Sequence, residues 1–317
     1  MFEQAKKIIE ESNSIYLVGH VNPDGDAIGS TYAIYFALKK MGKDAHVVMP
    51  DHSTAFDFLP RIDEHVKSID VDHYDLLIAL DASDNTRLVI SKEEYDKAGK
   101  IIMLDHHQVT NPYGDFIHID DSRSSASEIA YIFLQYITDN DIDKDMATML
   151  YTGIMTDTGC FNYANTSSRT LRVVAELIDI GAEHLMVNKM LNDTIKEAKL
   201  RLVAKTIENI ESFYDNKLKY SYVPFEDIAA LGIGDEDAEG MTNYLRSIEG
   251  AQFAVYVRGK SDGSIKVSMR SGGKADVSKI AIEFGGGGHP RAAGCNMQTS
   301  INQAKERIIN EVRAHLK

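Results

Sequence analysis

The chain has 317 residues, 44% of them hydrophobic and 26% charged, with two cysteines, Cys160 and Cys295. This length exceeds one ordinary domain, so we expect two domains with the composition of a soluble globular protein. Two cysteines this far apart in sequence do not suggest a disulfide scaffold, and no apolar run is long enough to cross a bilayer. We therefore expect a cytoplasmic protein with no membrane partner.

The negative charge is spread unevenly along the chain. The formal net charge is −14; residues 1–191 hold 16 basic and 31 acidic side chains, whereas residues 251–317 hold 11 basic and 5 acidic ones. Affinity for long nucleic acids comes from Lys and Arg side chains that neutralise phosphates. An acidic first part followed by a basic tail argues against a long duplex as partner and favours a small anionic ligand.

Residues 14 to about 190 alternate short β-type runs with helical patterns. The β-type runs are "SIYLVGH", "AHVVMP", "YDLLIALD" and "KIIMLDHH". The segment "DAIGSTYAIYFALKKMG" between the first two has helical spacing of its apolar residues, with Gly42 at the position of a C-cap glycine. This alternation predicts an α/β fold: a parallel sheet with helices on both faces, whose ligands gather at the carboxyl ends of the strands.

The helical period then extends from about 186 to 214, a segment that we expect to link the two halves and to act as their hinge. Beyond it lie the strand-like runs "LKYSYV", "AQFAVYVRG" and "IKVSMRS", a helix around "DAEGMTNYLRSI", the glycine-rich "FGGGGHPRAAGC" and a last helix near 301–315. The predicted domains are residues 1–191 and a smaller α/β domain over residues 192–317.

Polar side chains of one kind follow several apolar segments of the first domain. They are His20, Asp24 and Asp26 after the first run, Asp81 after "LLIAL", Asp105, His106 and His107 after "IIML", and Asp157 in "GIMTDTG". A single aspartate at such a place is commonly a helix cap or turn residue. Their recurrence at one edge of a predicted sheet favours a common site.

The candidate metal ligands in this set combine two imidazoles with four carboxylates. They are His20, Asp24, Asp26, Asp81, His106 and Asp157, with a formal charge of −4 when both histidines are neutral. Two divalent cations would balance that charge, and an oxygen-rich set with nitrogen favours Mn²⁺, with Mg²⁺ or Co²⁺ as alternatives. Hydrolysis of a phosphoester is the reaction that paired cations of this kind support.

The motifs "GHVNPDGDAIGS", "ALDASD", "LDHH" and "MTDTG" resemble, in order, the four motifs of the DHH phosphoesterase superfamily. The resemblance implies that His20, Asp24 and Asp81 hold one metal, and that Asp26, Asp81, His106 and Asp157 hold the other. It also implies catalytic roles for three residues: Asp81 bridges the metals, His107 faces the substrate phosphate and Asp105 supports the site. For Asp105, hydrogen bonding to a neighbour is as good an interpretation as ligation.

Two segments of the basic tail, "VSMRS" (267–271) and "GGGGHPRAAG" (285–294), resemble the C-terminal domain of nucleotide-directed members. The resemblance implies that Arg270 and His289 contact the terminal phosphate and sugar. Gly287 and Gly288 belong to a loop able to point backbone N–H groups at an anion, although a mobile turn is the alternative. Arg291 either contacts the substrate or faces solvent.

Two further segments have alternative interpretations. In "DDSRSSASEIAYIF" (120–133), Ser125 or Ser127 caps a helix with Glu128 in its first turn, or Arg123 and these hydroxyls line the substrate cleft. Phe161 either packs in the core, which we favour, or stacks on a base.

The chain most resembles family members that hydrolyse very short oligoribonucleotides to mononucleotides and convert 3′-phosphoadenosine 5′-phosphate (pAp) to AMP. An acidic first domain fits such short substrates. Two alternatives remain: hydrolysis of cyclic di-AMP or of its linear product pApA, and a nucleotide- or RNA-binding module without turnover. The presence of all six candidate ligands favours an enzyme. The sequence leaves the preferred substrate, the metal and the oligomeric state, including a homodimer, open.

Overall fold

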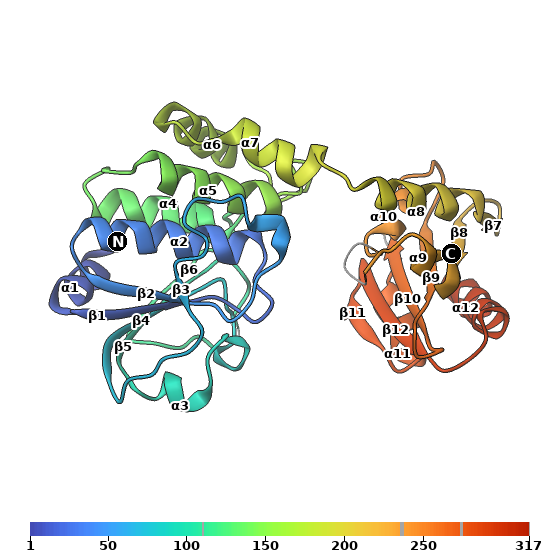
Figure 1. Cartoon of the computed structure of the whole chain (residues 1–317), viewed down its shortest axis with the longest axis horizontal. Helices are drawn as coiled ribbons and strands as arrows, with labels where there is room; N and C mark the ends of the chain where they lie inside the picture. The colour runs from blue at the N-terminus through green and yellow to red at the C-terminus, as the bar shows by residue number, and fades with distance from the viewer. Residues whose placement is uncertain (110, 235–237, 273–274, 317) are drawn as a thin grey trace. The chain divides into compact units, whose positions relative to one another are not determined.

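The computed structural model describes residues 1–109, 111–234, 238–272 and 275–316 (Figure 1). The chain forms two compact units, Met1–Thr194 and Ile195–Lys317, which we call unit 1 and unit 2. Within the described ranges, no helix combines the length and the apolar character needed to cross a lipid bilayer.

Unit 1 is built on a six-stranded parallel sheet, as predicted, with the order β3-β2-β1-β4-β5-β6. The strands are β1 (Ser14–Val18), β2 (Asp44–Val48), β3 (His65–Val66), β4 (Tyr74–Leu80), β5 (Ala98–Asp105) and β6 (Phe116–Ile119). The strand order reverses between β1 and β4, and parallel sheets of this kind bind ligands outside the carboxyl ends of the strands at that point.

Both faces of this sheet are covered, to different extents. The helices of unit 1 are α1 (Glu3–Glu11), α2 (Gly25–Lys40), α3 (Lys92–Tyr95), α4 (Ala126–Ile137), α5 (Lys144–Asp157), α6 (Ser168–Ile180) and α7 (His184–Asn188). Helices α2, α4 and α5 cover one face, with α6 and α7 outside them, while the short α3 and connecting segments cover the other (Figure 1). The larger core therefore lies under α2, α4 and α5.

Helices α2 and α5 approach each other backbone to backbone. Every residue of α2 from Gly25 to Leu38 is buried. A Cβ atom at Gly29 would collide with the carbonyl oxygen of Met149 on α5, and one at Gly25 would collide with Thr156. Gly153 of α5 is equally confined, because a Cβ there would meet Ser127 and Asp26. Glycine at these three positions lets the two helices lie closer than side chains would allow.

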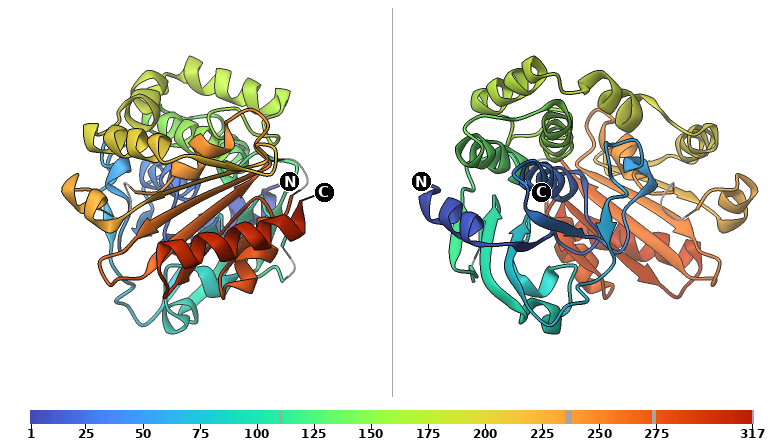
Figure 2. Two further views of the ribbon diagram at one scale, coloured as in Figure 1. Left: turned by 90° about the vertical axis from the view of Figure 1, so that its right-hand side faces the viewer. Right: turned by 60° about the vertical axis from the view of Figure 1, so that its left-hand side comes forward.

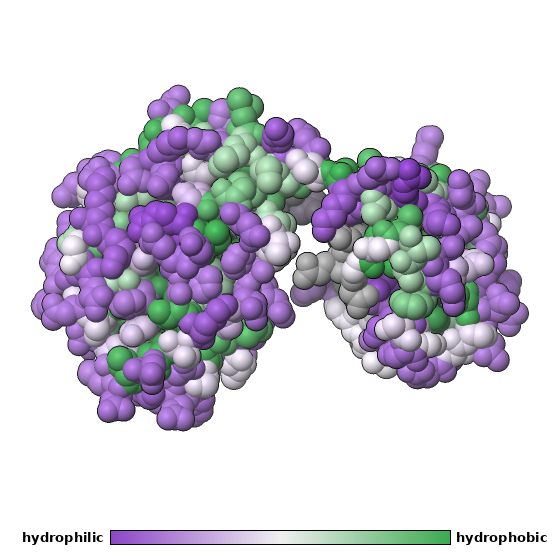
Figure 3. Space-filling model, in the orientation of Figure 1, coloured by the Kyte–Doolittle hydropathy of each residue, from purple (hydrophilic) through white to green (hydrophobic). Residues whose placement is uncertain are grey.

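The segment that joins the units differs from the continuous helical span expected over 186–214. Helix α7 runs into a π-helical turn at Lys189–Asp193, residues 194–196 are not helical, and α8 (Glu197–Glu208) follows. The Thr194 hydroxyl donates a hydrogen bond to the Lys189 carbonyl oxygen, and Thr194 and Lys196 have extended backbones. This local side-chain bond competes with helix continuation. Leu185 and Ile195 remain exposed in this segment. The faces of the two units seen in Figure 3 are mainly hydrophilic.

Unit 2 contains a mixed six-stranded sheet with the order β11-β12-β10-β9-β8-β7, in which only the β8–β9 pair is parallel among the described residues. The strands are β7 (Glu211–Phe213), β8 (Leu218–Val223), β9 (Phe253–Gly259), β10 (Ile265–Ser271), β11 (Gly287–His289) and β12 (Ala292–Met297).

Helices cover both faces of the unit 2 sheet. They are α8, α9 (Phe225–Ala230) and α10 (Met241–Arg246) against one face, and α11 (Val277–Glu283) and α12 (Ile301–His315) against the other. Figure 2 shows α12, coloured red, lying along the sheet. Each unit thus has its own apolar core.

We expect Gly29→Ala to destabilise unit 1. Alanine favours a helix over glycine by about 0.5–1 kcal/mol, but the new methyl group would press on backbone atoms of α5, and overpacking costs about 1–3 kcal/mol. The net loss should appear in urea denaturation. Gly234→Ala is the matched control, because a Cβ at Gly234 meets open space. Equal stability of the two variants would contradict the close approach of α2 and α5.

Candidate metal centre

The fold brings together all six candidate metal ligands at the carboxyl edge of the unit 1 sheet. Their ligand atoms form sets within 4.8 Å: His20, Asp24 and Asp81; Asp26, His106 and Asp157; and Asp81, His106 and His107. The first set contains the residues that the family resemblance implies for one metal, and the second contains three of the four implied for the other. Asp81 belongs to the first set and shares the third set with His106, so it lies between the two groups, as expected of a bridging ligand.

Asp81 presents one carboxylate oxygen to each side of the site. His20 Nε2 lies 3.7 Å from Asp81 Oδ2, whereas His106 Nε2 lies 3.5 Å from Asp81 Oδ1. His106 Nε2 also lies 3.8 Å from Asp26 Oδ2 and 3.8 Å from Asp157 Oδ2. The imidazole nitrogens and carboxylate oxygens therefore face one another around two neighbouring positions.

The backbone of Asp81 is strained. Asp81 directly follows β4 with a φ of +53°, in the left-handed region that non-glycine residues rarely adopt. Its side chain is 3% exposed, and Oδ1 accepts no hydrogen bond from the described residues. Strain of this kind costs about 1–3 kcal/mol and gathers at functional sites. A buried carboxylate oxygen without a hydrogen bond fits a ligand for a cation.

Asp26 is fixed by the start of a neighbouring helix. It is 1% exposed, and its two oxygens accept hydrogen bonds from the backbone N–H groups of Ala126 (2.7 Å) and Ser127 (2.8 Å) at the N-terminus of α4. Ser125 caps α4 by accepting a bond from the Glu128 N–H, which confirms the predicted cap. Because helix N-termini stabilise carboxylates, α4 holds Asp26 in place.

Asp24 is both the N-cap residue of α2 and a candidate metal ligand. Its Oδ1 caps α2 by accepting hydrogen bonds from the N–H groups of Asp26 (3.0 Å) and Ala27 (3.1 Å), and lies 3.8 Å from His20 Nε2. The His20 Nδ1 lies 2.8 Å from the Val21 carbonyl oxygen. A carbonyl only accepts, so Nδ1 carries the proton and Nε2 has the lone pair that a metal needs.

Asp105 supports His107. Asp105 is fully buried, and its Oδ1 accepts hydrogen bonds from the backbone N–H of His107 (2.8 Å) and from His107 Nδ1 (2.9 Å). The hydrogen bond that His107 donates to Asp105 and its contact with Asp81 outweigh burial and raise the pKa of His107 to about 10. With Nδ1 engaged, Nε2 of this half-exposed imidazole is the nitrogen available to a substrate.

The crowding of carboxylates raises several pKa values in the centre. Burial and the charges of Asp81 and Asp157 raise the pKa of Asp26. Burial also raises the pKa of Asp157, to about 6. Burial lowers the pKa of His106, but the contact with Asp81 and the surrounding carboxylates outweigh it and raise that pKa to about 9. The negative charge of the four carboxylates thus exceeds the positive charge that the nearby histidines can provide. Divalent cations would balance the excess.

Two residues that the sequence analysis did not assign to the centre hold its outer part. Asn165 Nδ2 donates to Asp157 Oδ2 (3.3 Å), to the Asp157 carbonyl oxygen (3.1 Å) and to the Ser124 carbonyl oxygen (2.9 Å). Buried Glu128 accepts bonds from the Ser124 N–H (3.1 Å) and from Arg123 and Arg169. A single sequence carries no signal for these tertiary contacts. They place Ser124 just before the residues that bind Asp26.

The structure favours one of the two interpretations left open for Arg123 and for Phe161. Arg123 is bonded to Asp120 (2.9 Å) and Glu128 (3.1 Å), which favours a structural role over lining a cleft. Phe161 packs against the core of unit 1, with its ring centroid 6.3 Å from that of Tyr151, which favours the core interpretation.

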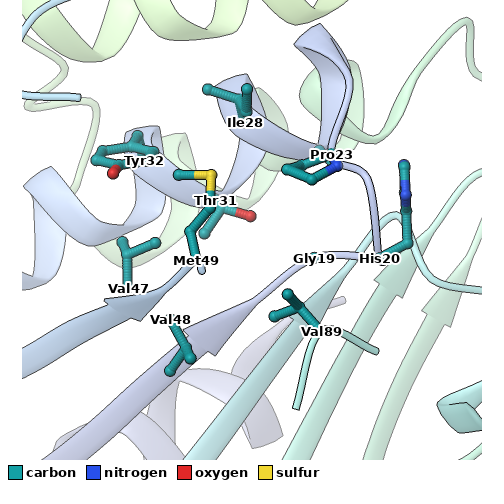
Figure 4. Close-up of a pocket in the computed structure, with 11 residues that line it drawn as sticks. Gly19, His20, Pro23, Ile28, Thr31, Tyr32, Val47, Val48, Met49 and Val89 are labelled. Atoms are coloured by element: carbon teal, nitrogen blue, oxygen red, sulfur yellow. The ribbon is translucent and has the colours of Figure 1, made fainter. Parts of the chain in front are cut away.

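A small apolar cavity lies behind His20, between α2 and the ends of β1 and β2 (Figure 4). Its volume is about 10 Å³, and its lining includes Val47, Met49 and Thr31, whose buried hydroxyl has no hydrogen-bond partner among the described residues. This volume is about that of one water-sized probe. The cavity is therefore too small for a nucleobase.

In unit 2, the sheet register puts Arg270 and His289 on one face. Arg270 of β10 and His289 of β11 are both paired with Ala292 of β12, one from each side. Directly paired residues point to the same face, so the two side chains flank a small one in a single row. The guanidinium makes one hydrogen bond in the described structure, to the Met269 carbonyl oxygen (3.2 Å).

The glycine-rich segment was expected to form a loop, but part of it is a β-strand. Gly287–His289 form the edge strand β11, and a Cβ at Gly288, where φ is +140°, would collide with β12. Successive N–H groups of a strand point in opposite directions, so those of Gly287 and Gly288 do not face one anion together. Arg291 is exposed and follows this strand.

Comparison with known proteins identifies the class. Residues 14–154 match the family model "DHH family, N-terminal domain", and residues 215–317 match the DHHA1 domain model. The chain belongs to the DHH phosphoesterase family.

Individual relatives are similar over nearly the whole chain. A bifunctional oligoribonuclease and PAP phosphatase NrnA of Thermus thermophilus is 34% identical, over 95% of this chain and 90% of the relative. A cyclic-di-AMP phosphodiesterase PdeA of Listeria monocytogenes is 26% identical over 98% of this chain, which spans 49% of that relative. The crystal structure of an exopolyphosphatase-related protein from Bacteroides fragilis has a TM-score of 0.89 and 26% identity, covering 99% of this chain and 95% of that one.

Glu128→Gln should lower the stability of unit 1 in a pH-dependent way. Burial alone would raise the pKa of Glu128, but hydrogen bonds from Ser124, Arg123 and Thr170 outweigh it and hold that pKa below the usual 4.5. A lowered folded-state pKa stabilises the fold above the unfolded pKa, and this contribution is lost as the pH falls through the folded value.

We expect the variant to lose about 1.5–3 kcal/mol near pH 7, with the difference shrinking below about pH 4.5. Urea denaturation between pH 3.5 and 7 measures it, with exposed Glu93→Gln as the control. A difference that stays constant with pH would contradict the charged state of Glu128.

Proposed function

We propose that this protein hydrolyses very short oligoribonucleotides to mononucleotides and pAp to AMP. The observation that supports this most directly is the position of Asp81, which turns one oxygen to His20 and the other to His106. Its buried Oδ1 accepts no hydrogen bond from the described residues. The similarity to the Thermus thermophilus relative, which covers most of both chains, supports the choice of substrates.

Under this proposal the six candidate ligands hold two divalent cations. His20, Asp24 and Asp81 hold one, and Asp26, Asp81, His106 and Asp157 hold the other. Such a pair activates water and stabilises the negative charge of a phosphoryl group. The mixed oxygen and nitrogen donors favour Mn²⁺, with Mg²⁺ and Co²⁺ as alternatives.

Residues other than the proposed metal ligands act on the phosphate. Protonated His107 is oriented by Asp105 and can donate a hydrogen bond from Nε2 to a phosphate oxygen. Arg270 and His289 bind the terminal phosphate and the sugar, with Gly287, Gly288 and Arg291 beside them. A guanidinium can bind two phosphate oxygens at once, so Arg270 is the stronger contact of the two.

A second candidate function is hydrolysis of cyclic di-AMP or pApA. The Listeria monocytogenes relative carries the cyclic-di-AMP activity in its name, but this chain spans only half its length. A panel of pAp, pApA, short RNAs and cyclic di-AMP with Mn²⁺ and a chelator control separates the candidates. Release of mononucleotides from short RNA and of AMP from pAp supports the first, whereas selective turnover of cyclic di-AMP or pApA supports the second.

Asp81→Ala should abolish hydrolysis of every substrate in that panel, because it removes the carboxylate proposed to bridge the two cations. Binding of Mn²⁺ measured by calorimetry should fall at the same time. Exposed Asp72→Ala is the control for the loss of one carboxylate. Near-normal turnover by Asp81→Ala would refute the two-metal proposal.

Arg270→Ala should act mainly on substrate binding. Loss of a charged contact to phosphate is worth about 1.5–3 kcal/mol, so KM should rise by about 10-fold or more while kcat changes less. Arg291→Ala should have a smaller effect, because that side chain is exposed. A fall in kcat with unchanged KM would contradict the binding role.

A further inference from the structure

Unit 1 needs a contact for the nucleoside part of a substrate as well as for its phosphate. The cavity behind His20 has a volume of about 10 Å³ and cannot admit a base. The base and sugar of a nucleotide are uncharged near pH 7, so the charged groups of the centre act on the phosphate rather than on the nucleoside. A contact that does not depend on charge is stacking of a base on an aromatic ring, and it is worth about 1–3 kcal/mol per base.

Two aromatic residues follow the ligand Asp157, at positions 161 and 163. Phe161 is engaged with Tyr151 and the core of unit 1. Tyr163, in contrast, is 59% exposed, and its hydroxyl has no hydrogen-bond partner among the described residues. Of these two aromatic residues, Tyr163 therefore has the ring surface that is accessible to a ligand.

The ring of Tyr163 is held against the backbone of Gly159. A Cβ atom at Gly159 would collide with Cζ, Cε1 and Cε2 of this ring, so glycine provides the space in which the ring lies. Gly159, Cys160 and Phe161 all have left-handed backbones, with φ of +55°, +55° and +65°. Such a strained run persists only where surrounding contacts hold it, and it is characteristic of functional segments.

Hydrogen bonds join the segment that carries Tyr163 to Asp157 and to its neighbour Thr158. The Tyr163 N–H donates to the carbonyl oxygen of Thr158, at 3.0 Å. Asn165, two residues later, donates to Asp157 Oδ2 at 3.3 Å. Gly159 lies two residues from Asp157, so their Cα atoms are at most about 7.6 Å apart. The ring is therefore fixed close to a ligand of the metal centre.

We propose that Tyr163 is the stacking platform for the nucleobase adjoining the phosphate under attack. This inference rests on the proposed function and deepens it, because it names how unit 1 distinguishes a nucleotide from other phosphoesters. One face of the ring lies against Gly159, so the side chain of Tyr163 already has little freedom to move. Stacking of a base on the other face therefore costs little additional side-chain entropy. Isolated exposed aromatics are ordinary. Tyr163, however, also has a glycine seat and a backbone bond to Thr158, the residue after Asp157.

The test compares Tyr163→Ala and Tyr163→Phe with the wild type. The substrates are pApA and the same dinucleotide with both bases replaced by hydrogen, assayed with Mn²⁺. We expect Tyr163→Ala to lower kcat/KM for pApA by about 5- to 150-fold, mainly through KM, which is the range that 1–3 kcal/mol of stacking implies. Tyr163→Phe should retain activity, and the abasic substrate should be hydrolysed equally by all three proteins.

Tyr244→Ala is the matched control, because Tyr244 is a 39% exposed tyrosine on α10 of unit 2. Its activity on pApA should equal that of the wild type. An unchanged kcat/KM of Tyr163→Ala on pApA would overturn the inference, as would an equal loss on the abasic substrate, which would mean damage to the metal centre.

Calorimetry with AMP and with inorganic phosphate, both with Mn²⁺, separates this inference from the proposed function. If the wild type hydrolyses none of the substrates, the proposed function fails. The inference then stands if Tyr163→Ala weakens the binding of AMP but not of phosphate, and falls if the two ligands are affected alike. Activity of the wild type together with an unaffected Tyr163→Ala variant overturns the inference alone.

Discussion

The close approach of α2 and α5 is the constraint on which the metal centre depends. Asp26 belongs to α2 and Asp157 to the end of α5, so the distance between these carboxylates is set by how near the two helices come. Gly29 and Gly153 remove the side chains that would keep them apart. A wider spacing would also pull Asp26 away from the N-terminus of α4, which supplies both of its backbone hydrogen bonds.

The centre is electrostatically unfavourable by itself, and the fold offsets this with rigid support. Four carboxylates face one another in a partly buried space, and Asp81 adds a strained backbone. Glu128 and Asn165 hold the surrounding segments through hydrogen bonds. Of these bonds, the one from Asn165 to Asp157 Oδ2 involves an oxygen of a candidate ligand. Functional sites often concentrate such local costs, and the well-packed core under α2 and α5 compensates them.

Local signals predicted local structure well. Apolar spacing and the glycine at 42 predicted α2, and the serines before Glu128 predicted the cap of α4, because the interactions involved span only a few residues. Two predictions based on local patterns were wrong. The helical span over 186–214 is broken at residues 194–196, and the glycine run contains the edge strand β11, because pairing with β12 outweighs the conformational freedom of glycine.

The sequence by itself determined the alternation of strands and helices, the identity of the candidate ligands and the family, since these depend on residue type, order and spacing. Only the tertiary structure decided that Asp81 turns one oxygen to each ligand set, that Asp24 also caps α2, and that Arg270 and His289 flank Ala292. It also distinguished Phe161, partly buried against the core, from exposed Tyr163. The physical reason is that burial, strand register and helix spacing arise from contacts between residues far apart in the chain, which spacing along the sequence does not encode.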